Sequence, residues 1–150
     1  MDNCIFCKIG RGEFDSAKIW EDEEFFSILD LNPNTKGMAL VLTKKHYDSY
    51  AFSMPDDIYQ RFALAAKKVG EKLQKALDAR RVALVMEGMG VNHAHIKLYP
   101  MHGLDKDFKE LLAKDKMFFK EYPGYVTTVL GPRIDIKELK KLAEEIRNKS

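Results

Sequence analysis

Cysteine, long apolar runs and a leader segment are scarce or absent in this chain of 150 residues. The only two cysteines are Cys4 and Cys7, which excludes a framework of several disulfides. No apolar run approaches the roughly 20 residues that a membrane-spanning helix requires. The first residues lack the basic and apolar regions of a signal peptide. We therefore expect an intracellular, cytoplasmic protein that does not insert into a membrane.

A strong excess of one charge is also absent. The chain carries 25 basic and 23 acidic residues, a net charge of +2. No global field then favours nucleic acid or an anionic membrane surface as a partner. The length allows one domain with a proper hydrophobic core and leaves too little chain for a second.

Up to residue 100 the apolar pattern predicts five strands, which together with two main helices indicate an α+β fold. Residues 17–30 read as two short strands around an acidic turn, 38–43 as a strand buried on both faces, and 81–87 and 91–100 as two further strands. Such strands suit a mainly antiparallel sheet.

The helices are marked by their start signals and their periodicity. A capping serine, a proline and two aspartates open a long amphipathic helix over residues 53–78. A second, basic amphipathic helix begins at Asp135. Its lysines are interpreted as a solvated face and not as a nucleic-acid surface. We also expect a short helix over 108–112 and a strand over 125–130.

The stretch VNHAHIKLYP, residues 91–100, raises the question of function. Strand alternation places His93, His95 and Lys97 on one face and apolar residues on the other. The two imidazoles would lie roughly 7 Å apart. This spacing suits a metal pair, a nucleophile with a helper, or an ordinary polar strand face, and alternation alone leaves all three open.

The two cysteines form a C-x-x-C pair, CIFC. In a reducing compartment such a pair is typical of metal ligands or of a redox couple. A thioredoxin-type couple would follow a strand, and no strand precedes Cys4. The pair therefore favours half of a zinc site.

The sequence HAHIKLY, residues 93–99, resembles the signature of the histidine triad family of nucleotide hydrolases and transferases, His-φ-His-φ-His-φ-φ with φ apolar. It keeps the first two histidines and has Lys97 in place of the third. Residues 4–33 and 35–46 (TKGMALVLTKKH) also resemble segments of bacterial members. The resemblance covers residues 4–103, so we expect a histidine triad core at 1–103 and an extension at 104–150 packed on the same domain.

The resemblance implies a zinc site. Family members that begin with C-x-x-C use as ligands the positions occupied here by Cys4, Cys7, His46 and His93. That set would form a closed, structural Cys2His2 tetrahedron. The alternative is that the cysteines are free thiols and His46 is a loop residue.

The resemblance also implies that His95 is the nucleophile. Its imidazole would attack the α-phosphorus of a nucleotide derivative, and water would resolve the nucleotidyl-histidine. His93 belongs to the same catalytic stretch, but a histidine bound to zinc cannot also exchange protons freely. Lys97 would stabilise phosphate charge while relaying protons poorly at neutral pH; the alternative is that it extends into solvent.

Seven residues are implied to contact the nucleotide. Asp30 stands where family members bind the ribose hydroxyls, Gly90 offers a backbone N–H to phosphate, and Asn92 offers a side-chain amide. The base would lie against four apolar residues, Phe6, Ile9, Ile28 and Leu31.

Two departures weaken the expectation of ordinary hydrolysis. Met86 stands nearest a position that is Asn in the family, and the loop at 87–90 is short, with Met89 in place of glutamine. We therefore expect a zinc-containing hydrolase or transferase acting on a purine nucleotide or dinucleotide. The alternatives are a nucleotide-binding module without turnover and a zinc-stabilised interaction protein. By resemblance we also expect a homodimer.

Overall fold

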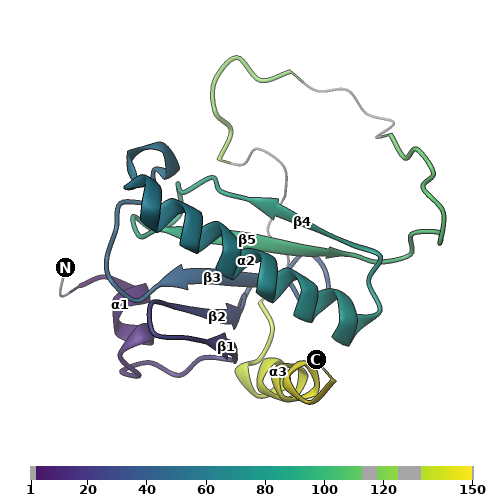
Figure 1. The fold of residues 1–150 in the computed structure, drawn as a ribbon, viewed down its shortest axis with the longest axis horizontal. Helices are drawn as coiled ribbons and strands as arrows, with labels where there is room; N and C mark the ends of the chain where they lie inside the picture. The colour runs from purple at the N-terminus through teal and green to yellow at the C-terminus, as the bar shows by residue number, and fades with distance from the viewer. Residues whose placement is uncertain (1–2, 113–117, 125–132, 150) are drawn as a thin grey trace.

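The computed structural model of the protein describes residues 3–112, 118–124 and 133–149, and contains one five-stranded sheet (Figure 1). The strands lie in the order β1-β2-β3-β5-β4, with every neighbouring pair antiparallel. Their bounds are β1 Lys18–Glu21, β2 Phe25–Leu29, β3 Ala39–Thr43, β4 Arg81–Val85 and β5 His95–Met101. The predicted α+β class with a five-stranded antiparallel sheet is confirmed.

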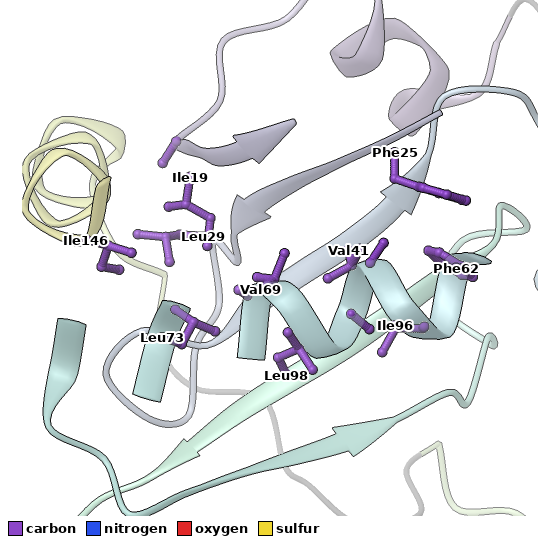
Figure 2. Close-up of a cluster of buried hydrophobic side chains, with 14 of the residues drawn as sticks. Ile19, Phe25, Leu29, Val41, Phe62, Val69, Leu73, Ile96, Leu98 and Ile146 are labelled. Atoms are coloured by element: carbon purple, nitrogen blue, oxygen red, sulfur yellow. The ribbon is translucent and has the colours of Figure 1, made fainter. Parts of the chain in front are cut away.

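One long helix, α2 (Asp56–Leu77), covers one face of the sheet (Figure 1). It starts directly after Pro55, with two aspartates in its first turn near the positive end of the helix dipole. Figure 2 shows Phe62, Val69 and Leu73 of α2 pointing toward strand residues such as Val41. The predicted helix over 53–78 therefore agrees with the structure to within a few residues.

The C-terminal helix, α3 (Ile136–Lys149), packs against α2 and β1 (Figure 1). Its buried residues Leu139, Ala143 and Ile146 belong to the same apolar cluster as the α2 face. The end of the chain thus shares the main core, while the boundary at residue 103 stays a prediction.

The other face of the sheet carries a second, smaller apolar cluster. Phe26 and Ile28 of β2 lie beside Leu42 and Leu40 of β3. A short N-terminal helix, α1 (Ile5–Gly10), packs Phe6 and Ile9 against this cluster. Every residue of β2 and β3 is buried because side chains cover both faces.

Three sequence predictions need correction. The strand over 91–100 begins at His95 and continues through Pro100 to Met101, so His93 lies in the bend before it. The strand predicted over 81–87 ends at Val85. The helix predicted over 108–112 is wrong: residues 104–112 form no helix or strand, and the side chains of Phe108, Leu111 and Leu112 are exposed.

The predicted strand over 125–130 lies outside the described residues. Among the helices that the structure describes, none is long and apolar enough to cross a membrane.

Candidate metal centre and active site

Two thiols and two imidazoles from distant parts of the chain form one cluster. The Nδ1 atom of His93 lies 3.4 Å from Cys4 Sγ and 3.5 Å from Cys7 Sγ. The Nδ1 atom of His46 lies 3.2 Å from His93 Nδ1 and 3.4 Å from Cys7 Sγ. All four ligand atoms lie within 4.8 Å of one another, an arrangement that could hold a metal ion.

Local structure explains why these four residues meet. Cys4 is the N-cap of α1 and Cys7 lies three residues further on, so both thiols face the same side of the first turn. His46 follows the end of β3, and His93 precedes β5, the strand paired with β3. The helix packs over one end of the sheet and thereby brings its thiols to the two imidazoles.

The second ring nitrogen of His93 has a fixed partner. Its Nε2 donates to the Thr43 carbonyl oxygen at 2.7 Å, with the Thr43 hydroxyl 3.2 Å away. A proton on Nε2 leaves Nδ1 unprotonated and free to bind a metal. Burial lowers the pKa of His93 to about 4, which also favours the neutral ligand form.

Burial acts in the opposite direction on the Cys7 thiol. Desolvation, followed by the neighbouring Cys4, raises the pKa of Cys7 above its ordinary value. A buried thiol of this kind is a poor free nucleophile. Cys7 therefore has little of the character of an exposed, reactive thiol.

His95 is held in one tautomer beside this cluster. Its Nδ1 donates to the carbonyl oxygen of His93 at 2.7 Å, so Nε2 carries the lone pair. Burial lowers the pKa of His95, and the positive charge of Lys97 acts in the same direction. The ring of Phe6 packs edge-on against it, with centroids 5.4 Å apart.

Lys97 follows on the same face of β5, across from Leu40 of β3 and Val85 of β4. Its Nζ lies 3.6 Å from Oε2 of Glu87, and the side chains are 19% and 8% exposed. Because the pair is mostly shielded from water, it is not an ordinary surface ion pair. The expectation that Lys97 simply extends into solvent does not describe this arrangement.

The second carboxylate oxygen of Glu87 accepts a hydrogen bond from the phenol of Tyr122. This bond raises the pKa of Tyr122 to about 12, because the carboxylate stabilises the protonated phenol. Glu87 thus connects Lys97 to residue 122, in the C-terminal third of the chain.

The seven expected nucleotide contacts separate into two groups. Phe6 lies against His95, and the Asp30 carboxylate is close enough to influence the titration of His95. One Asp30 oxygen accepts from the backbone N–H of Asn32 at 2.7 Å. Ile9 and Ile28 lie in the apolar cluster under α1.

Three of the expected contacts lie in loops. Asn92 accepts hydrogen bonds from the backbone and hydroxyl of Ser49, at 2.9 and 3.1 Å. The carbonyl of Leu31 accepts from the N–H of Ile134. Gly90 is exposed in the loop between β4 and β5.

Sequence reasoning missed Glu87 and Thr43. Met86, which we read as the departure at this point, packs into the core beneath α2, whereas Glu87 reaches Lys97. The sequence alone did not show that the segment after β4 brings this carboxylate within 3.6 Å of the lysine ammonium. The sequence pointed only weakly to Thr43 as a site residue, because this residue ends a buried strand that leads to His46.

Together, the antiparallel sheet, the Cys2His2 cluster and the adjoining buried histidine form a small α+β protein that agrees with the histidine triad resemblance of the sequence. The HIT domain family model matches residues 11–104, and the chain belongs to the HIT family.

One curated relative and two solved structures are similar to this chain. An uncharacterised HIT-like protein of Methanocaldococcus jannaschii is 39% identical over 103 residues, covering 66% of this chain and 79% of the relative. The crystal structure of a hypothetical histidine triad nucleotide-binding protein of Sulfolobus tokodaii has a TM-score of 0.75 at 23% identity, covering 97% and 91% of the two chains. A zinc-bound histidine triad family protein of Mycobacterium smegmatis has a TM-score of 0.63 at 23% identity, covering 99% and 93%. At these identities the two structures show the fold alone.

Proposed function

We propose that the protein is a nucleotide hydrolase or nucleotidyltransferase that acts at an α-phosphate and uses His95 as its nucleophile. Its substrate would be a nucleoside phosphoanhydride, a phosphoramidate or a dinucleoside polyphosphate with a purine base. The observation that carries this proposal is the hydrogen bond from His95 Nδ1 to the His93 carbonyl. It fixes the lone pair on Nε2, where an in-line attack on phosphorus requires it.

The proposed reaction at His95 has two steps. In the first, Nε2 attacks the α-phosphorus, the bond to the leaving group breaks, and a nucleotidyl-histidine forms. In the second, water or another acceptor attacks the same phosphorus and returns the electron pair to Nε2. Lys97 would offset phosphate charge. Asp30 would bind the ribose, Phe6 and its apolar neighbours the base, and the Gly90 N–H and Asn92 amide the phosphate.

We also propose that the metal at the cluster is zinc. With bonds of about 2.3 Å to sulfur and about 2.0–2.1 Å to nitrogen, the edges of a zinc tetrahedron would measure about 3.3–3.8 Å. The ligand atoms of this chain are separated by 3.2–3.5 Å where they contact one another. Four protein ligands leave no open position, so the ion would be structural. It would hold α1 against the sheet and orient His93.

The second candidate function is nucleotide binding without turnover. The ion pair between Lys97 and Glu87 favours it, since a carboxylate already contacts the ammonium that would otherwise be available to a phosphate. The loop before β5 also lacks the side-chain donors expected at residues 89 and 90.

One experiment separates the two functions. The protein is incubated with AMP or GMP anhydrides and phosphoramidates, and a nucleotidyl adduct is sought by intact mass together with released product. An active enzyme turns substrate over, while His95→Ala loses at least about a hundredfold in rate because the nucleophile is gone. His102→Ala, which removes an exposed histidine outside the site, serves as the matched control. Wild-type turnover no faster than that of His95→Ala contradicts the enzyme proposal and leaves the binding module.

We further propose a homodimer that joins two sheets at β4. Among the strands that the structure describes, β4 is the edge of the sheet beside β5, and its Leu84 is 53% exposed. A cavity of about 1280 Å³ lies between α2, β4 and residues 103–112, away from His95. An edge strand with an exposed apolar side chain is a surface that a second strand can complete.

A further inference from the structure

At the position of the third histidine in the signature, this chain has Lys97, whose ammonium forms an ion pair with Glu87. Lys97 stands two residues after His95 on the same strand face, roughly 7 Å along the chain. Its ammonium faces Oε2 of Glu87 at 3.6 Å, and Tyr122 donates to the other oxygen of that carboxylate. Glu87 is therefore held between a cation and a phenol, and its side chain is only 8% exposed.

The nature of the leaving group decides what such a site can do. In an anhydride, a phosphate, carboxylate or sulfate oxygen leaves as a stable anion with the electron pair of the P–O bond, and no proton is needed. In a phosphoramidate, an amine nitrogen leaves and must receive a proton as the P–N bond breaks. Positive charge helps the first reaction, whereas the second needs an acid that gives up its proton.

A lysine is a far weaker proton donor than a histidine. Reference pKa values of about 10.4 for lysine and about 6.5 for histidine side chains separate the two acids by nearly four units. With proton transfer half complete in the transition state, this difference slows amine departure roughly tenfold to a hundredfold.

We propose that the Lys97–Glu87 pair makes this site selective for anhydride substrates, whose leaving group departs as an oxyanion, over phosphoramidates of amines. The inference rests on the proposed function and narrows its substrate class. Nε2 of His95 bonds to phosphorus as the P–O bond breaks, and the leaving oxygen takes the electron pair beside the Lys97 charge. Water then forms the new P–O bond, the P–N bond to His95 breaks, and the released proton passes to solvent. Glu87 acts as a positioning residue that holds the ammonium in place.

The test compares two substrates of one nucleoside: the mixed anhydride of its monophosphate with sulfate, and the phosphoramidate with a simple alkylamine. Their intrinsic reactivities differ, so the readout is the change between variants in the ratio of the two kcat/KM values. Lys97→His is expected to raise the phosphoramidate-to-anhydride ratio at least tenfold. Lys97→Arg keeps the charge without a transferable proton, so its ratio should stay equal to that of the wild type or fall.

Controls make each outcome decisive. Lys140→His changes a lysine of α3 that pairs with Asp15, and its ratio should not move. A ratio unchanged within threefold in folded Lys97→His overturns the inference. If that variant does not fold, a rise of the ratio in Lys97→Arg overturns it instead. Wild-type turnover of neither substrate is a different result, because it removes the proposed function itself.

Discussion

At the scale of single residues, His93 joins the two parts of the site through three atoms. Its Nδ1 faces the thiols and His46, its Nε2 donates to Thr43, and its carbonyl oxygen accepts from His95. A metal ion on Nδ1 would fix the ring, and the backbone of the same residue fixes the tautomer of the proposed nucleophile. We therefore expect a change at the metal cluster to reach His95 through one peptide unit.

The metal cluster can be tested with one ligand and one matched control. His46→Ala removes a cluster imidazole, so zinc retained after dialysis against a chelator should fall from one ion per chain to well below half, because three ligands bind far more weakly than four. His102→Ala removes an imidazole that donates to the Lys36 carbonyl outside the cluster and should retain the zinc. The measurement is metal content by mass spectrometry. Unchanged stoichiometric zinc in His46→Ala would remove this residue from the ligand set.

At the scale of elements, the two faces of the sheet differ in what they carry. One face lies under α2 and α3 and holds the larger apolar cluster. The other face carries His95 and Lys97 on β5, next to the apolar cluster that α1 partly covers. α2 and α3 cover the first face, whereas on the second face α1 packs over the buried apolar cluster beside the polar residues of β5. The helices thus decide which face of the sheet is available to a ligand.

The role of α3 in the core gives a stability prediction. Ile146 is fully buried in the cluster shared by α2 and the sheet. Ile146→Ala should lower the free energy of unfolding by about 2–5 kcal/mol, since it removes buried methyl groups and leaves a cavity. Lys141→Ala, on the exposed face of the same helix, should change it by less than about 0.5 kcal/mol. Urea denaturation measures both, and an equal effect in the two variants would show that α3 does not belong to the core.

At the scale of the whole molecule, the two edges of the sheet differ. At one edge, β1 packs against α3, whereas β4 at the other edge pairs only with β5 among the described strands. Beside β4, residues Phe108, Leu111 and Leu112 are more than 70% exposed. An unpaired edge next to exposed apolar side chains is costly for a protein that stays a monomer.

The proposed homodimer follows from this asymmetry and can be broken at one residue. Leu84→Glu places a charge on the β4 edge and should weaken dimerisation roughly a hundredfold or more, because an unpaired buried charge costs several kcal/mol. Phe14→Glu alters a comparably exposed apolar residue in the segment between α1 and β1, and should leave the dimer intact. Sedimentation equilibrium distinguishes the two. A wild-type protein that is monomeric at micromolar concentration, or a Leu84→Glu variant that still dimerises fully, contradicts the proposed interface.

The sequence predicted those features that depend on local pattern. The two short strands predicted within 17–30, the buried strand predicted at 38–43 and the amphipathic period of α2 agree with the observed elements to within a few residues. The prediction from sequence failed where no local pattern shows what a segment packs against. Residues 108–112 carry apolar side chains at roughly helical spacing, yet they form no helix, because a short helix is stable only when its apolar face packs.

The family signature and the identity of the four possible metal ligands could be read from the sequence alone, because residue type and order along the chain carry that information. Tertiary structure decided the rest. It turned His93 off the strand toward Cys4 and Cys7, and it brought Glu87, two residues past the end of β4, against Lys97. These contacts join residues up to 89 positions apart. Their geometry depends on how the strands pair and the helices pack, and no local periodicity encodes it.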